Sequence, residues 1–304
     1  MPYMNHIFCK LIRKGELDVI QIDHPLVRAT LLLQGAQLVE FSPQKNDFNN
    51  LLWLSKSVEY KQGKPLRGGI PICWPWFGNL EKNPDNIQQQ VKSEHRPAHG
   101  MVRDIPWHIS SIKESCESVI VELNVQSNES TLNIWPFDFS LIARFTFSQT
   151  LTLELITENT GKECFAFSQA LHTYLPTSDI TQTYIHNADQ AQYIDALDDW
   201  KEKVQQGRVV FNQETDRLYF FKKNSKSEQF KLRVETPGHQ LNLTTKNSLS
   251  AVIWNPWIEK SQRLSQFSAE DYESMYCIES ANVMSNHKTV AAKQKVSIFL
   301  KLEL

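Results

Sequence analysis

Glycine is scarce in this chain of 304 residues, which contains ten glycines, well below the share of about 7% that is usual in proteins. Because glycine permits close backbone approach and left-handed conformations, a glycine cluster in such a sequence marks an unusual backbone. One cluster is present, Arg67-Gly68-Gly69. We therefore expect an unusual backbone conformation in this segment.

The chain also lacks a strong charge of either sign, since 32 Lys and Arg stand against 34 Asp and Glu. This balance argues against nucleic acid or a membrane as a partner, because both attract strongly basic surfaces. No apolar run reaches the roughly 18 residues of a spanning helix, and Met1–Lys14 has no signal-peptide pattern. We expect a cytoplasmic protein and a monomer.

Paired cysteines are another feature that the sequence lacks. The number of cysteines is odd, they are widely separated, and no C-x-x-C occurs, which favours reduced thiols over a disulfide framework. The five are Cys9, Cys73, Cys116, Cys164 and Cys277.

The common nucleotide, zinc-protease and serine-hydrolase motifs are absent: G-x-x-x-x-G-K-[ST], G-x-G-x-x-G, H-E-x-x-H and G-x-S-x-G. His95 and His99 have the spacing of two metal ligands on a helix, but Pro97 lies between them. No cysteine or carboxylate completes a ligand set at an obvious spacing. We therefore expect neither a metal nor an organic cofactor.

Alternation of apolar and polar residues dominates the chain. From Leu141 to Leu155 most odd positions are apolar and most even positions are polar, which predicts two half-buried antiparallel strands. The same pattern occurs at 119–125, 230–234 and 296–304, and Ala29–Phe41 is predicted to form two strands around Gln34-Gly35.

Evidence for helices is thin. The segment Gln190–Gln205 is predicted to be a helix, with Asp198 and Asp199 on its solvated face. No strand–helix alternation, internal repeat or linker is present. We therefore expect an all-β fold, one large antiparallel β-sandwich domain over residues 1–304 with few short helices.

Two segments break the strand pattern with glycine, proline and arginine. Arg67–Gly78 contains two prolines and three aromatic residues, which predicts a packed, irregular loop. Ala98–Arg103 places His99 and Arg103 around a glycine. Two arginines on separate loops could clamp a phosphate or carboxylate. The alternative is that the aromatic residues belong to the core and Arg67 to the surface.

Two ionisable residues lie among apolar neighbours. Burial of His172, next to Leu171 and Leu175, would lower its pKa and keep it neutral. Glu279 follows Tyr-Cys-Ile, and an unpaired buried glutamate has a raised pKa that suits a general base. The alternatives are a hydrogen-bonded core histidine and a glutamate on the wet face of an edge strand.

Taken together, these segments resemble the hexose-6-phosphate mutarotases, or glucose-6-phosphate 1-epimerases, of the galactose-mutarotase-like superfamily. The resemblance covers nearly the whole chain. Its motifs, in the family's order, are Arg67-Gly-Gly-Ile-Pro with Trp74-Pro-Trp-Phe-Gly78, His99-Gly-Met-Val-Arg103, Leu171-His-Thr-Tyr174, Glu214-Thr-Asp-Arg217, and Trp254-Asn-Pro-Trp-Ile-Glu-Lys260 with Cys277-Ile-Glu279.

The resemblance implies an antiparallel β-supersandwich that interconverts the α and β anomers of a hexose 6-phosphate. It implies that His172 and Glu279 are catalytic. It further implies that the substrate is contacted by Arg67, Arg103 and Asp216, and we add His99 and Trp254 as candidate binding residues. One departure is Ala98, where the family often has glutamine. This change puts one polar contact in doubt.

Anomer exchange needs a base at the anomeric hydroxyl and an acid at the ring oxygen. We assign Glu279 as the base and His172 as the acid, with Arg67 and Arg103 on the phosphate. Asp216 is expected to accept hydrogen bonds from sugar hydroxyls or to orient His172. The competing hypotheses are a non-catalytic carbohydrate-binding β-sandwich and a glycosidase that uses two carboxylates, such as Glu279 and Asp216.

Overall fold

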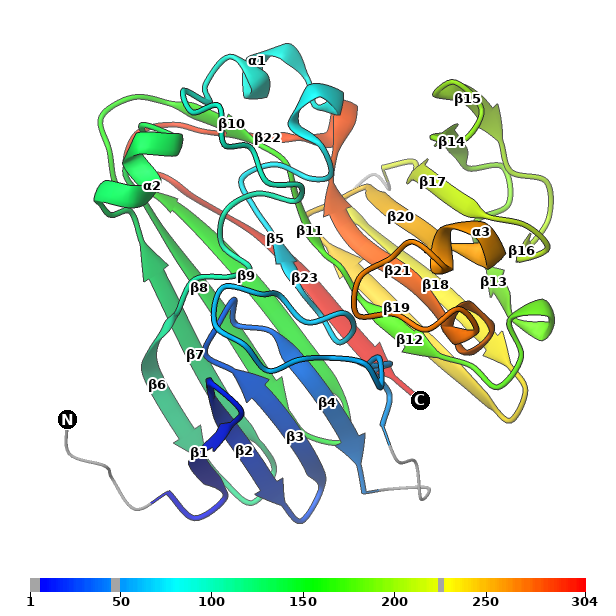
Figure 1. Ribbon diagram of the computed structural model, residues 1–304, viewed down its shortest axis with the longest axis horizontal. Coiled ribbons are helices and arrows are strands. Elements are labelled where there is room, and N and C mark those ends of the chain that lie inside the picture. Colours follow the sequence, from blue (N-terminus) through cyan, green and yellow to red (C-terminus); the bar gives the residue numbers. More distant parts are fainter. Residues whose placement is uncertain (1–5, 45–49, 224–226) are drawn as a thin grey trace.

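The computed structural model describes residues 6–44, 50–223 and 227–304. The first five residues, which belong to the segment without a signal-peptide pattern, lie outside the described residues. Figure 1 shows the arrangement: long strands on the left, a second sheet on the right, and a smaller blue sheet below.

The largest sheet has nine strands in the order β16-β13-β18-β19-β23-β9-β8-β7-β6, and neighbouring strands are antiparallel. Its strands are β6 (His108–Glu114), β7 (Val119–Gln126), β8 (Phe139–Phe147), β9 (Leu151–Asn159), β13 (Tyr184–His186), β16 (Val209–Val210), β18 (Gln229–Thr236), β19 (His239–Lys246) and β23 (Lys295–Glu303). The strands predicted at 119–125, 141–155, 230–234 and 296–304 are confirmed.

The second large sheet follows the order β15-β14-β17-β20-β21-β11-β5, and β12 also pairs with β21. Its strands are β5 (Ile72–Cys73), β11 (Gln169–Leu171), β12 (Tyr174–Pro176), β14 (Gln192–Asp195), β15 (Lys201–Val204), β17 (Thr215–Phe220), β20 (Ser250–Asn255) and β21 (Met275–Asn282). One face of this sheet packs on the nine-stranded sheet. The buried hydroxyls of Ser280 and Thr245 meet there at 2.6 Å.

The remaining strands form two smaller sheets: β1 (Cys9–Lys14), β2 (Leu17–His24), β3 (Val27–Leu32) and β4 (Leu38–Pro43) in one, and β10 (Phe165–Phe167) with β22 (Lys288–Val290) in the other. The pair β3 and β4 confirms the two strands predicted within Ala29–Phe41. A single apolar cluster joins residues of the four-, eight- and nine-stranded sheets.

Helices are few and short in the described part of the chain: α1 (Asp85–Gln88), α2 (Glu129–Ile134), α3 (Trp257–Ser261) and the 3₁₀ turns η1 (Leu80–Lys82), η2 (Ile180–Gln182), η3 (Asp271–Ser274) and η4 (Met284–Asn286). None of these described helices has the length and apolar character needed to cross a membrane. All five cysteines are free thiols.

The helix predicted over Gln190–Gln205 is wrong, because this segment forms the antiparallel hairpin of β14 and β15. Packing overrides the local pattern: Tyr193 stacks on Tyr219 of the neighbouring strand, with ring centroids 5.0 Å apart. The expected helix face is also wrong. Asp198 lies in the hairpin turn and pairs with Lys201 at 2.6 Å.

Candidate active site

Strand alternation places Glu279 on the face of the eight-stranded sheet that turns away from the nine-stranded sheet. Its neighbours on β21, Ile278 and Ser280, belong to the interior between the two sheets. Successive side chains on a strand point to opposite faces. Glu279 therefore faces the other side, paired in register with Val252 of β20.

His172 lies at the break between β11 and β12, two strands that both pair with β21. The pairs Leu171 with Ser280 and Tyr174 with Cys277 share one register, which sets His172 opposite Glu279 across the break. The His172 amide instead donates to the carbonyl of Pro71 at 2.9 Å. This interruption frees the His172 side chain to face the carboxylate.

A cavity of about 520 Å³ opens over this face of the sheet. It is lined by both polar and aromatic side chains, among them Arg67, Phe77, His99, His172, Tyr174, Trp200, Asp216, Trp254, Lys260 and Glu279. A second hollow of about 510 Å³ contains Arg103 and shares Arg67, His172 and Tyr174 with the first. His172 is thus common to both.

Close backbone contacts at glycine bring the two arginine-bearing loops to this point. A Cβ at Gly69 (φ +65°) would lie 2.1 Å from the carbonyl oxygen of Leu38, and one at Gly100 (φ +80°) would lie 2.0 Å from that of Trp74. These positions exclude other residues. The irregular, packed loop predicted for Arg67–Gly78 is confirmed, apart from the two-residue strand β5 within it.

His172 and Glu279 form a buried pair, with Nε2 of the imidazole 3.3 Å from Oε1 of the carboxylate. Burial raises the pKa of Glu279 well above the usual glutamate range, and the Asp216 carboxylate adds to this while Arg103 opposes it. Among the residues that the structure describes, Oε2 of Glu279 and Nδ1 of His172 have no hydrogen-bond partner. The pair therefore has free polar atoms for a third group.

Burial lowers the pKa of His172 well below its usual range, and His99, Arg103 and Arg67 act in the same direction. The imidazole is therefore neutral at pH 7, as the sequence predicts. Its ring stacks on Tyr174 with centroids 4.7 Å apart, and Trp254 lies edge-on at 6.2 Å. Aromatic contacts on two sides fix the orientation of the ring.

His99 lies edge-on to His172, with ring centroids 5.5 Å apart. Burial and the charges of Arg103 and Arg67 lower the pKa of His99 to about 3, so this ring is neutral. Its Nδ1 accepts the amide of Gly78 at 3.3 Å. The proton is therefore on Nε2, which makes His99 a hydrogen-bond donor on the cavity wall.

The guanidinium groups of Arg67 and Arg103 are held by backbone carbonyls. Arg67 Nε donates to Ser265 at 3.3 Å, and Arg103 Nη2 donates to Ala98 at 2.8 Å. Both arginines line the second hollow, so the structure brings together the two charges that the sequence assigns to one anion.

Comparison of this sequence with models of known protein families identifies its family. The model of the aldose 1-epimerases matches residues 18–303. The chain belongs to the aldose 1-epimerase family.

Relatives of this epimerase include a protein of Escherichia coli K12 that carries the provisional name glucose-6-phosphate 1-epimerase. It is 32% identical over 298 residues, which cover 96% of this chain and 93% of the relative. A crystal structure of a provisionally named mutarotase from Salmonella typhimurium has a TM-score of 0.85 at 28% identity, over 99% of this chain and 94% of the other.

A galactose mutarotase related enzyme from Lactobacillus acidophilus has a TM-score of 0.71 at 11% identity, covering 94% of this chain and 96% of its own. At this level of sequence identity, the structural similarity shows the fold alone. The expected galactose-mutarotase-like, antiparallel β-structure of this epimerase is confirmed.

Asp216 of this epimerase lies in register with Trp254, and both line the cavity. Asp216 is not the carboxylate that contacts His172, since that position is taken by Glu279. Asp216 pairs instead with Lys260, whose Nζ lies 3.7 Å from Oδ2. Of the two roles expected for Asp216, its position in the cavity wall favours accepting hydrogen bonds from sugar hydroxyls.

The aromatic residues of the Trp74–Phe77 stretch divide between core and cavity. Trp74 and Trp76 are fully buried in the core, so they are excluded as surfaces for a sugar ring. Phe77 and Trp254 line the cavity and are available. Sequence reasoning missed Trp200, which lines the same cavity, because it placed that residue on a helix.

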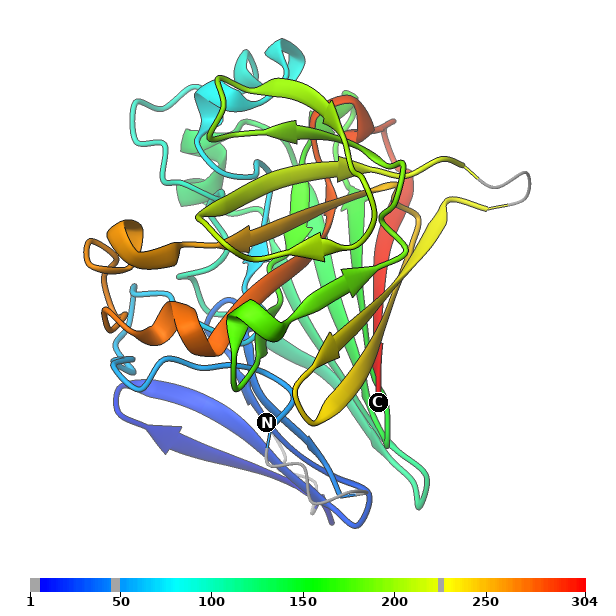
Figure 2. The ribbon, with the colours of Figure 1, turned by 90° about the vertical axis from the view of Figure 1, so that its right-hand side faces the viewer.

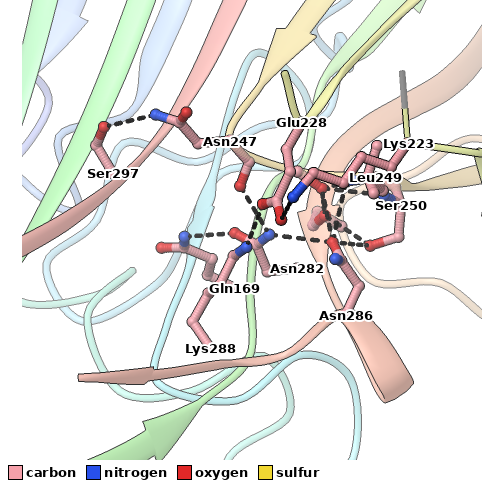
Figure 3. Close-up of polar contacts among 12 residues, drawn as sticks. Gln169, Lys223, Glu228, Asn247, Leu249, Ser250, Asn282, Asn286, Lys288 and Ser297 are labelled. Atoms are coloured by element: carbon pink, nitrogen blue, oxygen red, sulfur yellow. Dashed lines mark hydrogen bonds and ion pairs between the residues drawn. The ribbon is translucent and has the colours of Figure 1, made fainter. Parts of the chain in front are cut away.

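A buried network of amides and hydroxyls, shown in Figure 3, fixes the far end of β21. Gln169 of β11 donates to Oδ1 of Asn282 at 2.8 Å, three residues away from His172 and Glu279 respectively. Nδ2 of Asn282 then donates to Asn286 Oδ1 at 3.2 Å. This network holds β11 and β21 in the register that sets the catalytic candidates opposite each other.

Within residues 6–44, 50–223 and 227–304, no group of three or more His, Cys, Asp or Glu could hold a metal ion. His95, one of the two histidines with ligand spacing, is exposed, whereas His99 lines the cavity.

Proposed function

We propose that this epimerase interconverts the α and β anomers of a hexose 6-phosphate, with glucose 6-phosphate as the first candidate. The observation that carries the proposal is the shared position of His172. It contacts a buried carboxylate in one cavity and lines, with Arg67 and Arg103, the adjoining hollow. The acid–base pair and the proposed phosphate site therefore share His172 in their walls.

Glu279 acts as the base in this proposal. In the substrate complex, where the phosphate dianion favours the imidazolium form of His172 with a proton taken up from solvent, Glu279 removes the proton from the anomeric hydroxyl while His172 gives its added proton to the ring oxygen, and the ring opens to the aldehyde. After rotation about the carbon–carbon bond, Glu279 returns its proton and His172 regains one as the ring closes on the other face. The proton count of the protein is unchanged over the cycle. Such groups each contribute about 10²–10⁴-fold.

The phosphate has two roles in this proposal. Bonds from Arg67 and Arg103 hold it at a distance from the reacting carbon, which orients the sugar. The dianion also offsets the two positive charges that lower the pKa of His172. His172 thus becomes a better proton carrier when a phosphorylated sugar is bound.

The relatives support this substrate class, since the Escherichia coli K12 relative carries the provisional name glucose-6-phosphate 1-epimerase. His99 and Asp216 are proposed to bind sugar hydroxyls, as a donor and an acceptor respectively. Trp254 is proposed to lie against the apolar face of the ring.

The test compares anomer exchange of glucose 6-phosphate and free glucose by nuclear magnetic resonance. Arg67→Ala and Arg103→Ala are each expected to lower kcat/KM for the phosphate ester about 10- to 100-fold, since hydrogen bonds to charged groups contribute about 1.5–3 kcal/mol. Exchange of free glucose is expected to change little. The control is Arg28→Ala, an exposed arginine of the four-stranded sheet.

Equal losses for both sugars would place the phosphate elsewhere. Binding without exchange would favour the non-catalytic carbohydrate-binding hypothesis, and release of reducing sugar from an aryl glycoside would favour a glycosidase.

A further inference from the structure

Lys260 is a charged residue of the cavity to which the reaction as described gives no role. It lies on α3, which follows directly from β20 (Figure 2). The turn between them is fixed by Asn255, whose Nδ2 donates to two backbone carbonyls near the start of β21 and whose Oδ1 accepts the Trp257 amide. This turn directs the lysine back over the sheet.

The Lys260 ammonium contacts two carboxylates and an aromatic ring. Nζ lies 3.1 Å from Oε1 of Glu214, 3.7 Å from Oδ2 of Asp216 and 5.9 Å from the ring centre of Trp254. Its side chain is about one third exposed, at 32%. Partly exposed pairs of this kind contribute little to stability, so a role in fold stability alone is a weak explanation.

The Lys260 ammonium opposes the effect of the negative charges around Asp216. Glu214 lies beside it, Asp195 approaches from β14, and Glu279 lies on β21 in the same cavity. Burial raises the pKa of Asp216, Lys260 lowers it, and Glu214 and Asp195 raise it. Lys260 is thus a cation that acts on Asp216 against the acidic neighbours Glu214 and Asp195.

Asp216 in turn acts on Glu279, because it is the largest charge effect that raises the pKa of Glu279. Arg103 opposes it there, and on the other side Glu279 faces the neutral His172, beside which His99 lies. Two carboxylates in one cavity titrate as a coupled pair. The ammonium beside Asp216 determines how readily that pair takes up its first proton.

We propose that Lys260 is a positioning residue, which keeps Asp216 ionised and available to sugar hydroxyls and so extends to lower pH the range in which Glu279 works as a base. This inference rests on the proposed function, because it assumes that Glu279 is the base. Without the ammonium, Asp216 and Glu279 would share a proton at higher pH, whichever of the two carries it.

The experiment measures kcat/KM for anomer exchange against pH, since this profile reports the groups of the free enzyme. Lys260→Met is expected to move the acid limb of this profile, on which kcat/KM falls as the pH falls, to higher pH. It is also expected to raise KM on that limb. At alkaline pH, its rate should converge on that of the wild type. On the limb, kcat/KM falls about tenfold for each pH unit of displacement. Lys260→Arg keeps the charge and is expected to restore the limb.

Two controls separate the proposed effect from a general one. Lys201→Met removes an exposed lysine charge from the same sheet outside the cavity and is expected to leave the limb unmoved. In an Asp216→Asn background, Lys260→Met is expected to add no further shift, because the group through which it acts is gone. If Lys260→Met does not fold, Lys260→Gln takes its place.

An acid limb that stays at its wild-type position in Lys260→Met overturns the proposal, as does an equal shift in Lys201→Met or in the Asp216→Asn background. If Glu279→Gln is as active as the wild type, the proposed function itself fails. An inactive Glu279→Gln together with an unmoved limb in Lys260→Met refutes the role of Lys260 alone.

Discussion

Replacing Glu279 by glutamine is expected to stabilise the fold at alkaline pH. The residue is 1% exposed, and Oε2 has no hydrogen-bond partner in the described part of the chain. Because the pKa of Glu279 is raised in the folded protein, the native state disfavours the ionised carboxylate. The unfolded chain releases that proton at lower pH, so the carboxylate lowers stability as pH rises above the ordinary glutamate range. Glutamine has a similar shape and no charge.

The size of the effect follows from this burial. Replacing buried ionic groups by neutral ones of similar volume stabilises proteins by about 1–4 kcal/mol. For large domains, 1 kcal/mol moves Tm by roughly 2 °C. Glu279→Gln is therefore expected to raise Tm by about 2–8 °C at pH about 8. The gain should shrink toward zero near pH about 4, where Glu279 is protonated in the folded protein.

Scanning calorimetry of the wild type and Glu279→Gln at both pH values measures this difference. Glu117→Gln, at an exposed turn between β6 and β7, is the matched control and should leave Tm unchanged. A Tm below that of the wild type at alkaline pH would refute the reasoning. An equal gain at both pH values would show that the stabilisation does not come from loss of the charge.

Three further results are expected. The acid limb of wild-type kcat/KM should lie above the ordinary glutamate range, because the pKa of Glu279 is raised; a profile flat down to pH about 4.5 would contradict this. Gly100→Ala should lower the free energy of unfolding, measured with denaturant, by more than the roughly 1–2 kcal/mol of left-handed strain. Gly207→Ala, with a similar φ but open space around it, should lower it only by that strain. Equal losses would show that contact with Trp74 is unimportant. Gln169→Leu should destabilise by about 1–3 kcal/mol, because it removes the donor to Asn282; unchanged urea unfolding would contradict the role of the buried network.

The long strands could be predicted from sequence because each carries its own alternation. In the β8–β9 pair, buried and partly exposed residues alternate over all nine residues of β9 and from Leu141 to Phe147 of β8. The segment at 190–205 could not be predicted in this way, because a stacking contact between Tyr193 and Tyr219 from another strand decides its structure. Local periodicity contains no information about such a contact.

Several residues of the candidate cavity could be predicted from sequence, but Trp200 and the arrangement of the residues could not. Residues that disturb the strand pattern, such as Arg67, His172 and Glu279, are the ones that the fold gathers around the cavity. The spacing of His172 and Glu279 in the sequence gives no hint that one register sets them opposite each other. The partnership of Asp216 with Lys260 depends likewise on the turn at Asn255. The single-domain organisation, the monomeric state and the cytoplasmic location stay predictions.

Anomer exchange of glucose 6-phosphate, followed by magnetisation transfer between the α and β signals, tests the proposed reaction most directly. The wild type is expected to accelerate exchange over buffer without release of phosphate, while Glu279→Gln and His172→Asn each lose about 10²–10⁴-fold. Exchange by both variants at the wild-type rate, or a wild type no faster than buffer, would contradict the assignment of His172 and Glu279 as the acid and the base.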